Sequence, residues 1–292
     1  MKKTILLTGS TGYLGSYLAK ALVAKGHKLI ILKRKNSSLL QIESIVQMIT
    51  LYNIENLDYS IPFTAHGKID AVIHTATCYG RNGETLSEIF EANTSFPLRL
   101  MDAAKAAGVG IFINSDTILD KYVNLYSLSK SQLLEWGKFF CMYNKMFFVN
   151  MRLEHFYGPG DTESKFTTHV INSCMRNVPE LELTFGEQIR DFIYIDDVVS
   201  AYLIVLDKVK GFSDFFNEFD VGSGKALSIK KFVEKVHQIT DSQTYLAFGR
   251  VPYRKGEVMS SHANIDPLVK LGWFCKTNLE EGLKLVIEGY KK

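Results

Sequence analysis

A glycine turn near the start of the chain constrains its fold more than any other feature. Apolar residues 5–7 are followed by TGSTGYLG at 8–15, after which apolar residues repeat at helical spacing. This order predicts a strand, a tight turn and a helix. Glycine lets the backbone approach a pyrophosphate, whose charge the backbone N–H groups and the positive helix N-terminus stabilise. We therefore expect a dinucleotide site that includes Gly9, Thr11, Gly12, Tyr13, Leu14 and Gly15.

The end of the second predicted strand, residues 28–32, would lie beside the adenosine ribose. An acidic residue there would bind a free 2′-hydroxyl, whereas this chain has Lys33 and Arg34. Because cations fit a 2′-phosphate, the expected cofactor is NADP(H); a basic turn that only faces solvent is the alternative. A third strand, residues 48–54, would end in the candidate adenine contacts Asn53 and Ile54.

Strands and helices continue to alternate, which predicts an α/β fold with a doubly wound parallel sheet of the Rossmann type. In such sheets, ligands bind at the carboxyl ends of the strands. The fourth strand, 69–75, would place Thr75, Ala76 and Thr77 beside the cofactor. Further elements are expected as a helix over 84–107 with Gly108 as its C-cap, a strand at 111–113, a helix over 126–143 and a strand at 147–153.

Tyr126 and Lys130 lie four residues apart, so on a helix they share one face and the ammonium lies near the phenol. A free phenol has a pKa of about 10. Acid–base work at neutral pH needs a positive neighbour that favours the phenolate. The two residues are candidates for catalysis, although such pairs also occur on solvated helix faces.

Beyond residue 160 the alternation weakens, which indicates a smaller, partly helical substrate lobe interleaved with the first domain. Within it, RDFIYIDDVV at 190–199 predicts a strand followed by a helix capped by Asp196 or Asp197. We expect the NADP-binding domain to comprise residues 1–160, with 190–222 returning to it, and the substrate lobe to comprise mainly 161–189 and 223–292. Helices are also expected over 228–239 and 279–290.

Composition excludes several classes of protein. Hydrophobic residues make up 46% of the 292 residues and charged residues 22%, as in ordinary soluble globular chains. A net charge of +3, with dispersed Lys and Arg, argues against a nucleic-acid partner. No stretch approaches the roughly 20 apolar residues of a membrane helix. The four cysteines are widely spaced, so we expect reduced thiols, no metal site and a cytoplasmic location.

Together, these motifs resemble the extended short-chain dehydrogenase/reductase family that modifies nucleotide-activated sugars, within the NAD-dependent epimerase/dehydratase superfamily. The resemblance covers nearly the whole chain. Besides the glycine turn and the Tyr126–Lys130 pair, it rests on HTA at 74–76, Asn93, YGPG at 157–160, RDFIYIDDV at 190–198 and LGW at 271–273.

The resemblance implies that Tyr126 is the catalytic acid/base and that Lys130 lowers its pKa while binding the nicotinamide ribose. Ser115 matches a third catalytic position, a hydroxyl that bonds the reacting sugar oxygen. A homodimer through the helices at 84–107 and 126–143 is also implied. Asn93, Tyr126 and Lys130 join the cofactor contacts, and the nucleotide-sugar contacts are Thr77, Ser115, Asp116, Thr117, His155, Arg190 and Arg254, of which the two arginines would bind the diphosphate.

The segment NSDTILD at 114–120 bears on the reaction. At this segment the 4,6-dehydratases have a pattern similar to TDEVYG, in which a glutamate base stands where this chain has Thr117. The segment is more similar to the STDxxxD pattern of 4-ketosugar reductases such as the CDP-abequose and CDP-paratose synthases. Those enzymes reduce the 4-keto group of a CDP-3,6-dideoxyhexulose with NADPH. The same activity is therefore expected here, in the synthesis of surface-polysaccharide (O-antigen) sugars; an epimerase, a 4,6-dehydratase or a non-catalytic NADP sensor are the alternatives.

Three features depart from the family pattern. Only ten residues separate Ser115 from Tyr126, where a longer loop is usual, so a more open sugar site is expected. His155 replaces a frequent Asn, and His262 stands where an Asp is common.

Overall fold

The computed structural model describes residues 1–290. The chain forms two compact units: Met1–Arg152 with Tyr202–Phe219, and residues 153–201 with the chain from 220 onward. Residues 153–160, 190–201 and 220–222, assigned from the sequence to the nucleotide-binding domain, thus belong to the second unit. For the first two segments the reason is that their strands pair with each other in a separate sheet.

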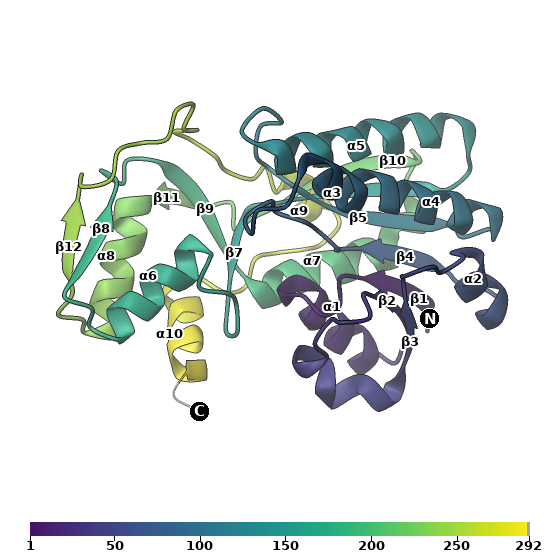
Figure 1. The fold of residues 1–292 in the computed structure, drawn as a ribbon, viewed down its shortest axis with the longest axis horizontal. Helices are drawn as coiled ribbons and strands as arrows, with labels where there is room; N and C mark the ends of the chain where they lie inside the picture. Colours follow the sequence, from purple (N-terminus) through teal and green to yellow (C-terminus); the bar gives the residue numbers. More distant parts are fainter. Residues whose placement is uncertain (291–292) are drawn as a thin grey trace. The chain divides into compact units, whose positions relative to one another are not determined.

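A seven-stranded sheet forms the centre of the first unit, in the order β10-β6-β5-β4-β1-β2-β3 (Figure 1). The pairs β1–β2, β2–β3, β1–β4 and β4–β5 are parallel, which confirms the predicted Rossmann-type fold. The strands are β1 (Thr4–Thr8), β2 (Lys28–Lys33), β3 (Ile49–Asn53), β4 (Ala71–His74), β5 (Ile111–Thr117), β6 (Phe147–Leu153) and β10 (Phe216–Val221).

Helices lie on both faces of this sheet, with α3, α4 and α5 on one face and α1 on the other (Figure 1). A buried apolar cluster that includes Leu6, Val72, Leu100 and Phe112 joins the sheet to the helices of the first face. The helices are α1 (Tyr13–Ala24), α2 (Ser60–His66), α3 (Leu86–Phe90), α4 (Phe96–Ala106), α5 (Leu125–Tyr143) and the later part of α7 (Ile195–Lys208), with 3₁₀ turns at Leu40–Met48 and Val209–Gly211.

The helix expected over 84–107 is interrupted by a π-helical turn, Glu91–Ser95, between α3 and α4. A π turn inserts one residue into the helix and often marks a functional site. It contains Asn93, whose buried side chain bonds outside the helix. Gly108 follows the C-cap residue Ala107 with a φ of 73°, a left-handed conformation that glycine adopts without strain.

Strand β5 extends to Thr117, whereas the sequence predicts its end at residue 113. Apolar patterning could not predict this extension, because residues 114–117 are polar. They continue the strand because distant side chains bind them: Asn150 bonds both Asn114 and Asp116, and Tyr202 bonds Ser115.

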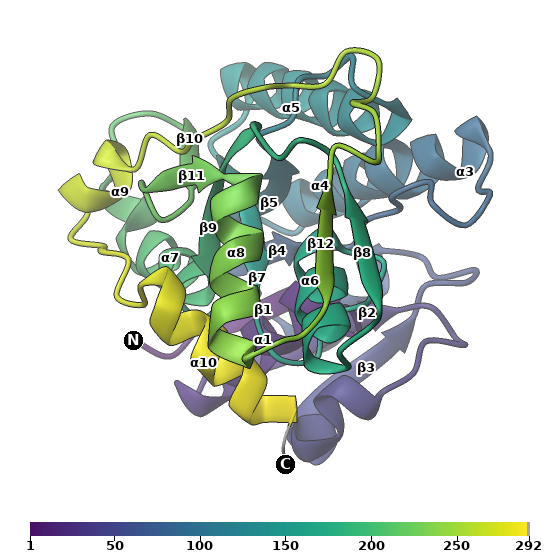
Figure 2. The same ribbon diagram turned by 90° about the vertical axis from the view of Figure 1, so that its left-hand side faces the viewer.

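The second unit contains two small sheets, β11-β9-β7 and β12-β8, with helices packed against one another beside them (Figure 2). Only β9 and two of its helices, α8 and α10, are predicted with similar bounds from the sequence. The elements are β7 (His155–Tyr157), β8 (Glu180–Leu183), β9 (Ile189–Tyr194), β11 (Ala226–Ser228), β12 (Tyr245–Phe248), α6 (Phe166–Met175), α8 (Ile229–Thr240), α9 (Asp266–Lys270) and α10 (Leu279–Tyr290).

Helix α7 begins at Ile195, so the prediction that Asp196 or Asp197 caps it is wrong. Both aspartates lie in the first turn. The Asp197 carboxylate instead accepts the backbone N–H groups of Lys276 and Thr277 at 3.0 and 2.9 Å. The buried Asp197 carboxylate therefore binds a distant backbone segment and does not cap its own helix.

No helix among residues 1–290 is long and apolar enough to cross a membrane.

Candidate active site

The glycine turn between β1 and α1 has two glycines that the fold itself requires. Gly9 has a φ of 73°, and a Cβ on it would come within 2.5 Å of the Ala76 backbone nitrogen. A Cβ on Gly15 would overlap the carbonyl oxygen of Gly9. Gly12, the exposed N-cap residue of α1, would meet only the Gly9 oxygen, at 3.3 Å. Its bare backbone therefore fits the close approach of a pyrophosphate.

The carboxyl ends of β1 and β4 are joined by side-chain bonds. The Thr8 hydroxyl lies 2.8 Å from Nδ1 of His74, and the Thr75 hydroxyl donates to the Thr8 carbonyl at 2.8 Å. Burial holds the pKa of His74 well below its ordinary value, with a further lowering from Lys130. His74 is thus a neutral core histidine, and the half-buried Thr75, Ala76 and Thr77 follow it at the edge of the sheet.

In the basic turn after β2, the two predicted cations occupy different environments. The Lys33 ammonium donates to the carbonyls of Arg34 and Lys35, at 3.1 and 3.2 Å, and so stabilises the turn itself. Arg34 is exposed. Asn53 is exposed at the end of β3, and Ile54 packs against the core. Arg34 therefore has the greater freedom to meet a phosphate.

Ser115 lies in β5 with 6% of its surface exposed. Its Oγ accepts a hydrogen bond of 2.7 Å from the hydroxyl of Tyr202, a fully buried residue of α7. Tyr202 was not predicted from the sequence, because a tyrosine within an apolar helical repeat is indistinguishable from a core residue.

Tyr126 is half-buried at the start of α5, two residues after the N-cap Asn124. Its ring centre lies 5.0 Å from that of Tyr79, and the Arg81 guanidinium lies 5.2 Å from the Tyr79 ring. Neither Tyr79 nor Arg81 was predicted; they come from the loop after β4. The loop after β4 therefore supplies part of the environment of the candidate acid/base.

The pKa of Tyr126 is raised well above its ordinary value, mainly by burial and further by Tyr79 and Asp116. A hydrogen bond with Thr117 acts in the opposite direction. The shift is opposite to the lowering expected from Lys130, because burial outweighs the favourable contributions. The phenol is consequently held in its protonated form at neutral pH.

Lys130 is 1% exposed, and its ammonium nitrogen has no hydrogen-bond partner within residues 1–290. Burial lowers its pKa from 10.5 to about 8, against the opposing effect of Asp116. An ammonium without acceptors is costly unless a ligand supplies them. Lys130 therefore fits the hydroxyl groups of a dinucleotide ribose.

A chain of buried polar groups lies at the end of the sheet. The Asn150 amide donates to Asp116 at 2.8 Å and to Glu218 at 2.9 Å, and Asn114 donates to Asn150 at 2.8 Å. The network holds the Asp116 carboxylate as a fixed negative charge near Lys130. Polar residues within the apolar strand patterns were the available signal for Asn114 and Asn150.

The Asn93 side chain forms hydrogen bonds within the protein through both its amide nitrogen and its amide oxygen. Its amide group donates to the Cys78 carbonyl and the Ser129 hydroxyl at 2.8 and 2.9 Å, and its oxygen accepts the Cys78 N–H at 2.8 Å. Asn93 thus joins the loop after β4 to α5. Its contact with a cofactor stays a prediction.

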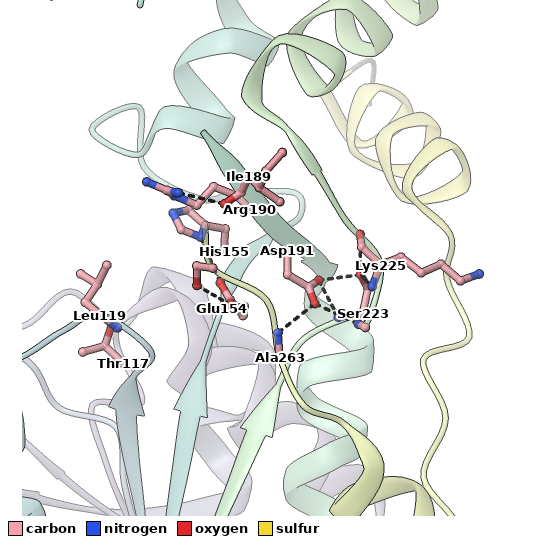
Figure 3. Close-up of polar contacts among 12 residues, drawn as sticks. Thr117, Leu119, Glu154, His155, Ile189, Arg190, Asp191, Ser223, Lys225 and Ala263 are labelled. Carbon is pink, nitrogen blue, oxygen red and sulfur yellow. Dashed lines mark hydrogen bonds and ion pairs between the residues drawn. The ribbon is translucent and has the colours of Figure 1, made fainter. Parts of the chain in front are cut away.

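The second unit contains the predicted diphosphate ligands. Arg190 in β9 is largely buried and forms an ion pair of 2.8 Å with Glu257, while Arg254 is exposed. In the neighbouring strand β7, Nδ1 of His155 lies 3.4 Å from the Glu154 carboxylate (Figure 3). Glu257 was not predicted, and it offsets the charge on Arg190.

Buried Asp191 organises the second unit (Figure 3). Its carboxylate accepts hydrogen bonds from the backbone N–H groups of Ser223, Gly224 and Ala263.

No group of three or more His, Cys, Asp or Glu among residues 1–290 could hold a metal ion.

The chain is similar to known proteins of one family. The model of the NAD dependent epimerase/dehydratase family matches residues 5–217. The CDP-abequose synthase of Salmonella muenchen is 34% identical, covering 98% of each chain, and that of Salmonella typhimurium is 32% identical, covering 99% of this chain and 98% of the relative.

Among solved structures, the UDP-glucose 4-epimerase of Thermotoga maritima, with UDP-glucose, superposes with a TM-score of 0.85 at 23% identity. The superposition covers 99% of this chain and 98% of the epimerase. At this identity the likeness concerns the fold. The family match and the two relatives of more than 30% identity establish the wider relationship. The chain belongs to the NAD dependent epimerase/dehydratase family and is similar to nucleotide-sugar enzymes within it.

Proposed function

We propose that this protein reduces the 4-keto group of a nucleotide-activated deoxyhexulose, with a CDP-3,6-dideoxyhexulose as substrate and NADPH as reductant. The observation that carries the proposal is the similarity to two CDP-abequose synthases over nearly the whole chain. Thr117 supports it, because a hydroxyl cannot act as the carboxylate base that a dehydratase needs. The product would enter surface-polysaccharide synthesis.

The residues of the first unit suit the proton chemistry of this reaction. When bound, NADPH supplies the hydride for C4 of the sugar. Tyr126, which is protonated at neutral pH, would donate a proton to the oxygen on C4. Ser115 donates a hydrogen bond to the same oxygen and stabilises the developing charge. Lys130 binds the ribose hydroxyls.

NADP(H) is proposed over NAD(H) on the basis of the turn after β2. Exposed Arg34 would meet the 2′-phosphate, while Lys33 stabilises the turn and contributes charge. The glycine turn would hold the pyrophosphate through Gly9, Thr11, Gly12, Tyr13, Leu14 and Gly15. Thr75, Ala76, Thr77 and Asn93 would contact the nicotinamide half, and Asn53 and Ile54 the adenine.

The proposed contacts of the nucleotide sugar are those expected from the sequence. Arg190 and Arg254 are proposed to bind its diphosphate, for which the planar guanidinium fork is well suited. The phosphate would compete with Glu257 for Arg190, because the carboxylate already occupies part of the fork. Thr77, Ser115, Thr117 and His155 are the proposed sugar contacts, whereas Asp116, held by Asn150, would act on the site through its charge.

The protein is further proposed to act as a cytoplasmic homodimer. Helix α5 carries a ridge of exposed apolar side chains, which we call the α5 ridge: Leu125, Trp136, Phe139, Met142 and Tyr143. Large exposed apolar patches usually mark interaction surfaces. Exposed Leu86 and Phe90 on α3, which packs against α5, extend the patch.

Turnover with a CDP-4-keto-3,6-dideoxyhexose tests the proposed reaction. Wild-type protein should consume NADPH stoichiometrically, and NADH more slowly, as measured by absorbance. An epimerase would instead recycle its cofactor, so product without NADPH consumption would overturn the proposal in favour of that alternative. Absence of any turnover with CDP-, dTDP-, UDP- and GDP-linked ketosugars would favour the non-catalytic alternative.

Tyr126→Phe tests the acid/base within that assay. The variant should lose about a hundredfold to ten-thousandfold in kcat, because general acid–base catalysis contributes on the order of 10²–10⁴. NADPH binding, measured by fluorescence, should change less than about twofold, because the ring is kept and the loss falls on proton transfer. Full activity in this variant would exclude Tyr126 as the proton donor.

A further inference from the structure

We propose that Tyr202 is a positioning residue that makes the Ser115 hydroxyl a hydrogen-bond donor to the reacting oxygen. The inference rests on the proposed function, because it assigns the reacting oxygen to a sugar carbonyl. It adds a residue of α7 that acts on the substrate only through Ser115.

The geometry defines which group donates. The Tyr202 hydroxyl lies 2.7 Å from Oγ of Ser115 and donates to it. Burial raises the pKa of Tyr202 far above its ordinary value, so the phenol keeps its proton. A hydroxyl has one proton and two lone pairs. Because one Ser115 lone pair accepts from Tyr202, the Ser115 proton is free to be donated in another direction.

The position of Ser115 in β5 restricts that direction. Successive side chains of a strand point to opposite faces of the sheet, so Asp116 points away from Ser115. Asn150 holds Asp116 on its face at 2.8 Å, while Tyr202 holds Ser115 on the other. Two side chains distant in sequence thus fix consecutive residues of the strand. A fixed serine needs little reorganisation as charge develops on the substrate oxygen.

The bond also strengthens Ser115 as a donor. Hydrogen bonds in a chain polarise one another, most strongly where the local dielectric is low. Tyr202 is fully buried and Ser115 is 6% exposed, so water competes little for this pair. The chain from Tyr202 through Ser115 to the substrate oxygen would favour negative charge at its end. Such an effect belongs to the transition state more than to the bound ketone.

Tyr202→Phe removes one oxygen and keeps the ring, so it isolates the hydrogen bond. We expect kcat to fall about tenfold, which corresponds to about 1.4 kcal/mol and lies at the upper end of the range for one hydrogen bond between neutral groups. KM for the nucleotide sugar and the Kd of NADPH should change less than about twofold. Tyr202→His, which retains a ring N–H donor, should recover part of the lost kcat.

A double-mutant cycle separates positioning from general damage. In a Ser115→Ala background, Tyr202→Phe should lower kcat by less than about twofold, because its only route to the substrate is gone. Equal losses with and without Ser115 would overturn the proposal. So would an unchanged kcat in Tyr202→Phe alone. All kinetics are measured below the lowest unfolding midpoint of the variants.

Tyr157→Phe is the matched control. Tyr157 is also a buried tyrosine whose hydroxyl donates a bond, here to the Leu279 carbonyl at 3.3 Å. This variant should keep the wild-type kcat; a loss equal to that of Tyr202→Phe would show that any buried tyrosine hydroxyl has this effect. The cycle is run on whichever reaction the wild type catalyses, ketone reduction or epimerisation. Failure of the proposed reduction is therefore distinguishable from failure of this inference.

Discussion

At the scale of single residues, Lys130 combines two features that oppose stability. It is a cation at 1% exposure, and no acceptor among residues 1–290 bonds its ammonium. Burial of an ion without hydrogen-bonded partners costs free energy. Asp116 offsets only part of this cost, since the pKa still falls to about 8. Groups with such perturbed pKa values cluster at functional sites.

The pH dependence of stability tests the burial of Lys130. Its pKa is 10.5 ordinarily and about 8 in the fold, so between these values the unfolded chain binds more protons. The Lys130 contribution to the free energy of unfolding therefore rises with pH across that window. The free energy of unfolding of the Lys130→Met variant should exceed that of the wild type by on the order of 3 kcal/mol at neutral pH. This difference should vanish above the ordinary lysine pKa.

Urea denaturation at several pH values measures this difference. Lys138→Met is the control, because Lys138 is a partly exposed residue of the same helix. A stability difference for Lys130→Met that does not vary with pH would contradict the assignment.

At the scale of elements, the three glycines of the turn between β1 and α1 are required for different physical reasons. Gly9 is required by its left-handed backbone and by its closeness to Thr75 and Ala76, which follow β4. Gly15 allows the first turn of α1 to touch the Gly9 carbonyl. Gly12 has only one close neighbour, so the fold depends on it least. The turn thus combines packing glycines with one that faces the proposed ligand.

Alanine substitutions at Gly12 and Gly15 should separate these reasons. Gly15→Ala should destabilise the protein by about 1–3 kcal/mol or more, because its Cβ overlaps backbone that cannot move freely. Gly12→Ala should cost less than about 1 kcal/mol, yet weaken NADPH binding at least about tenfold by blocking the pyrophosphate. Denaturation and fluorescence titration measure the two effects; equal effects of the variants on both measurements would refute the distinction.

At the scale of the whole molecule, the α5 ridge is the surface least explained by the fold of one chain. Trp136 and Phe139 are 52% and 54% exposed, and their ring centres lie 6.4 Å apart. Tyr143 continues the row, 5.0 Å from Phe139. Aromatic side chains are enriched in protein interfaces because they bury large areas at low entropic cost.

Phe139→Glu should convert the proposed dimer to a monomer, because a carboxylate in the middle of the α5 ridge would be buried without a partner. Sedimentation velocity measures the change. Leu40→Glu serves as control, since Leu40 is also an apolar, exposed residue and lies in the 3₁₀ turn Leu40–Met48, outside the α5 ridge. A monomeric wild type, or a Phe139→Glu protein that stays dimeric, would exclude this interface.

Local features of the sequence were enough to predict the fold class. The glycine turn, the apolar strands and helix α5 follow from residue spacing and backbone preference, which act over a few residues. The predicted strand at 147–153 has the bounds of β6, and the predicted helix at 279–290 has those of α10. The same local motifs carried the family resemblance, which the comparison with known proteins confirms.

Long-range contacts decided the rest, because they depend on which segments the sheet brings together. Tyr202 and Ser115 are 87 residues apart, so no local pattern could pair them. The extension of β5 to Thr117 and the raised pKa of Tyr126 likewise depend on distant partners and on burial. The sequence by itself determined that a dinucleotide fold with a Tyr–Lys pair would form. Only the tertiary structure decided the hydrogen bonds and burial that set the chemistry of each group.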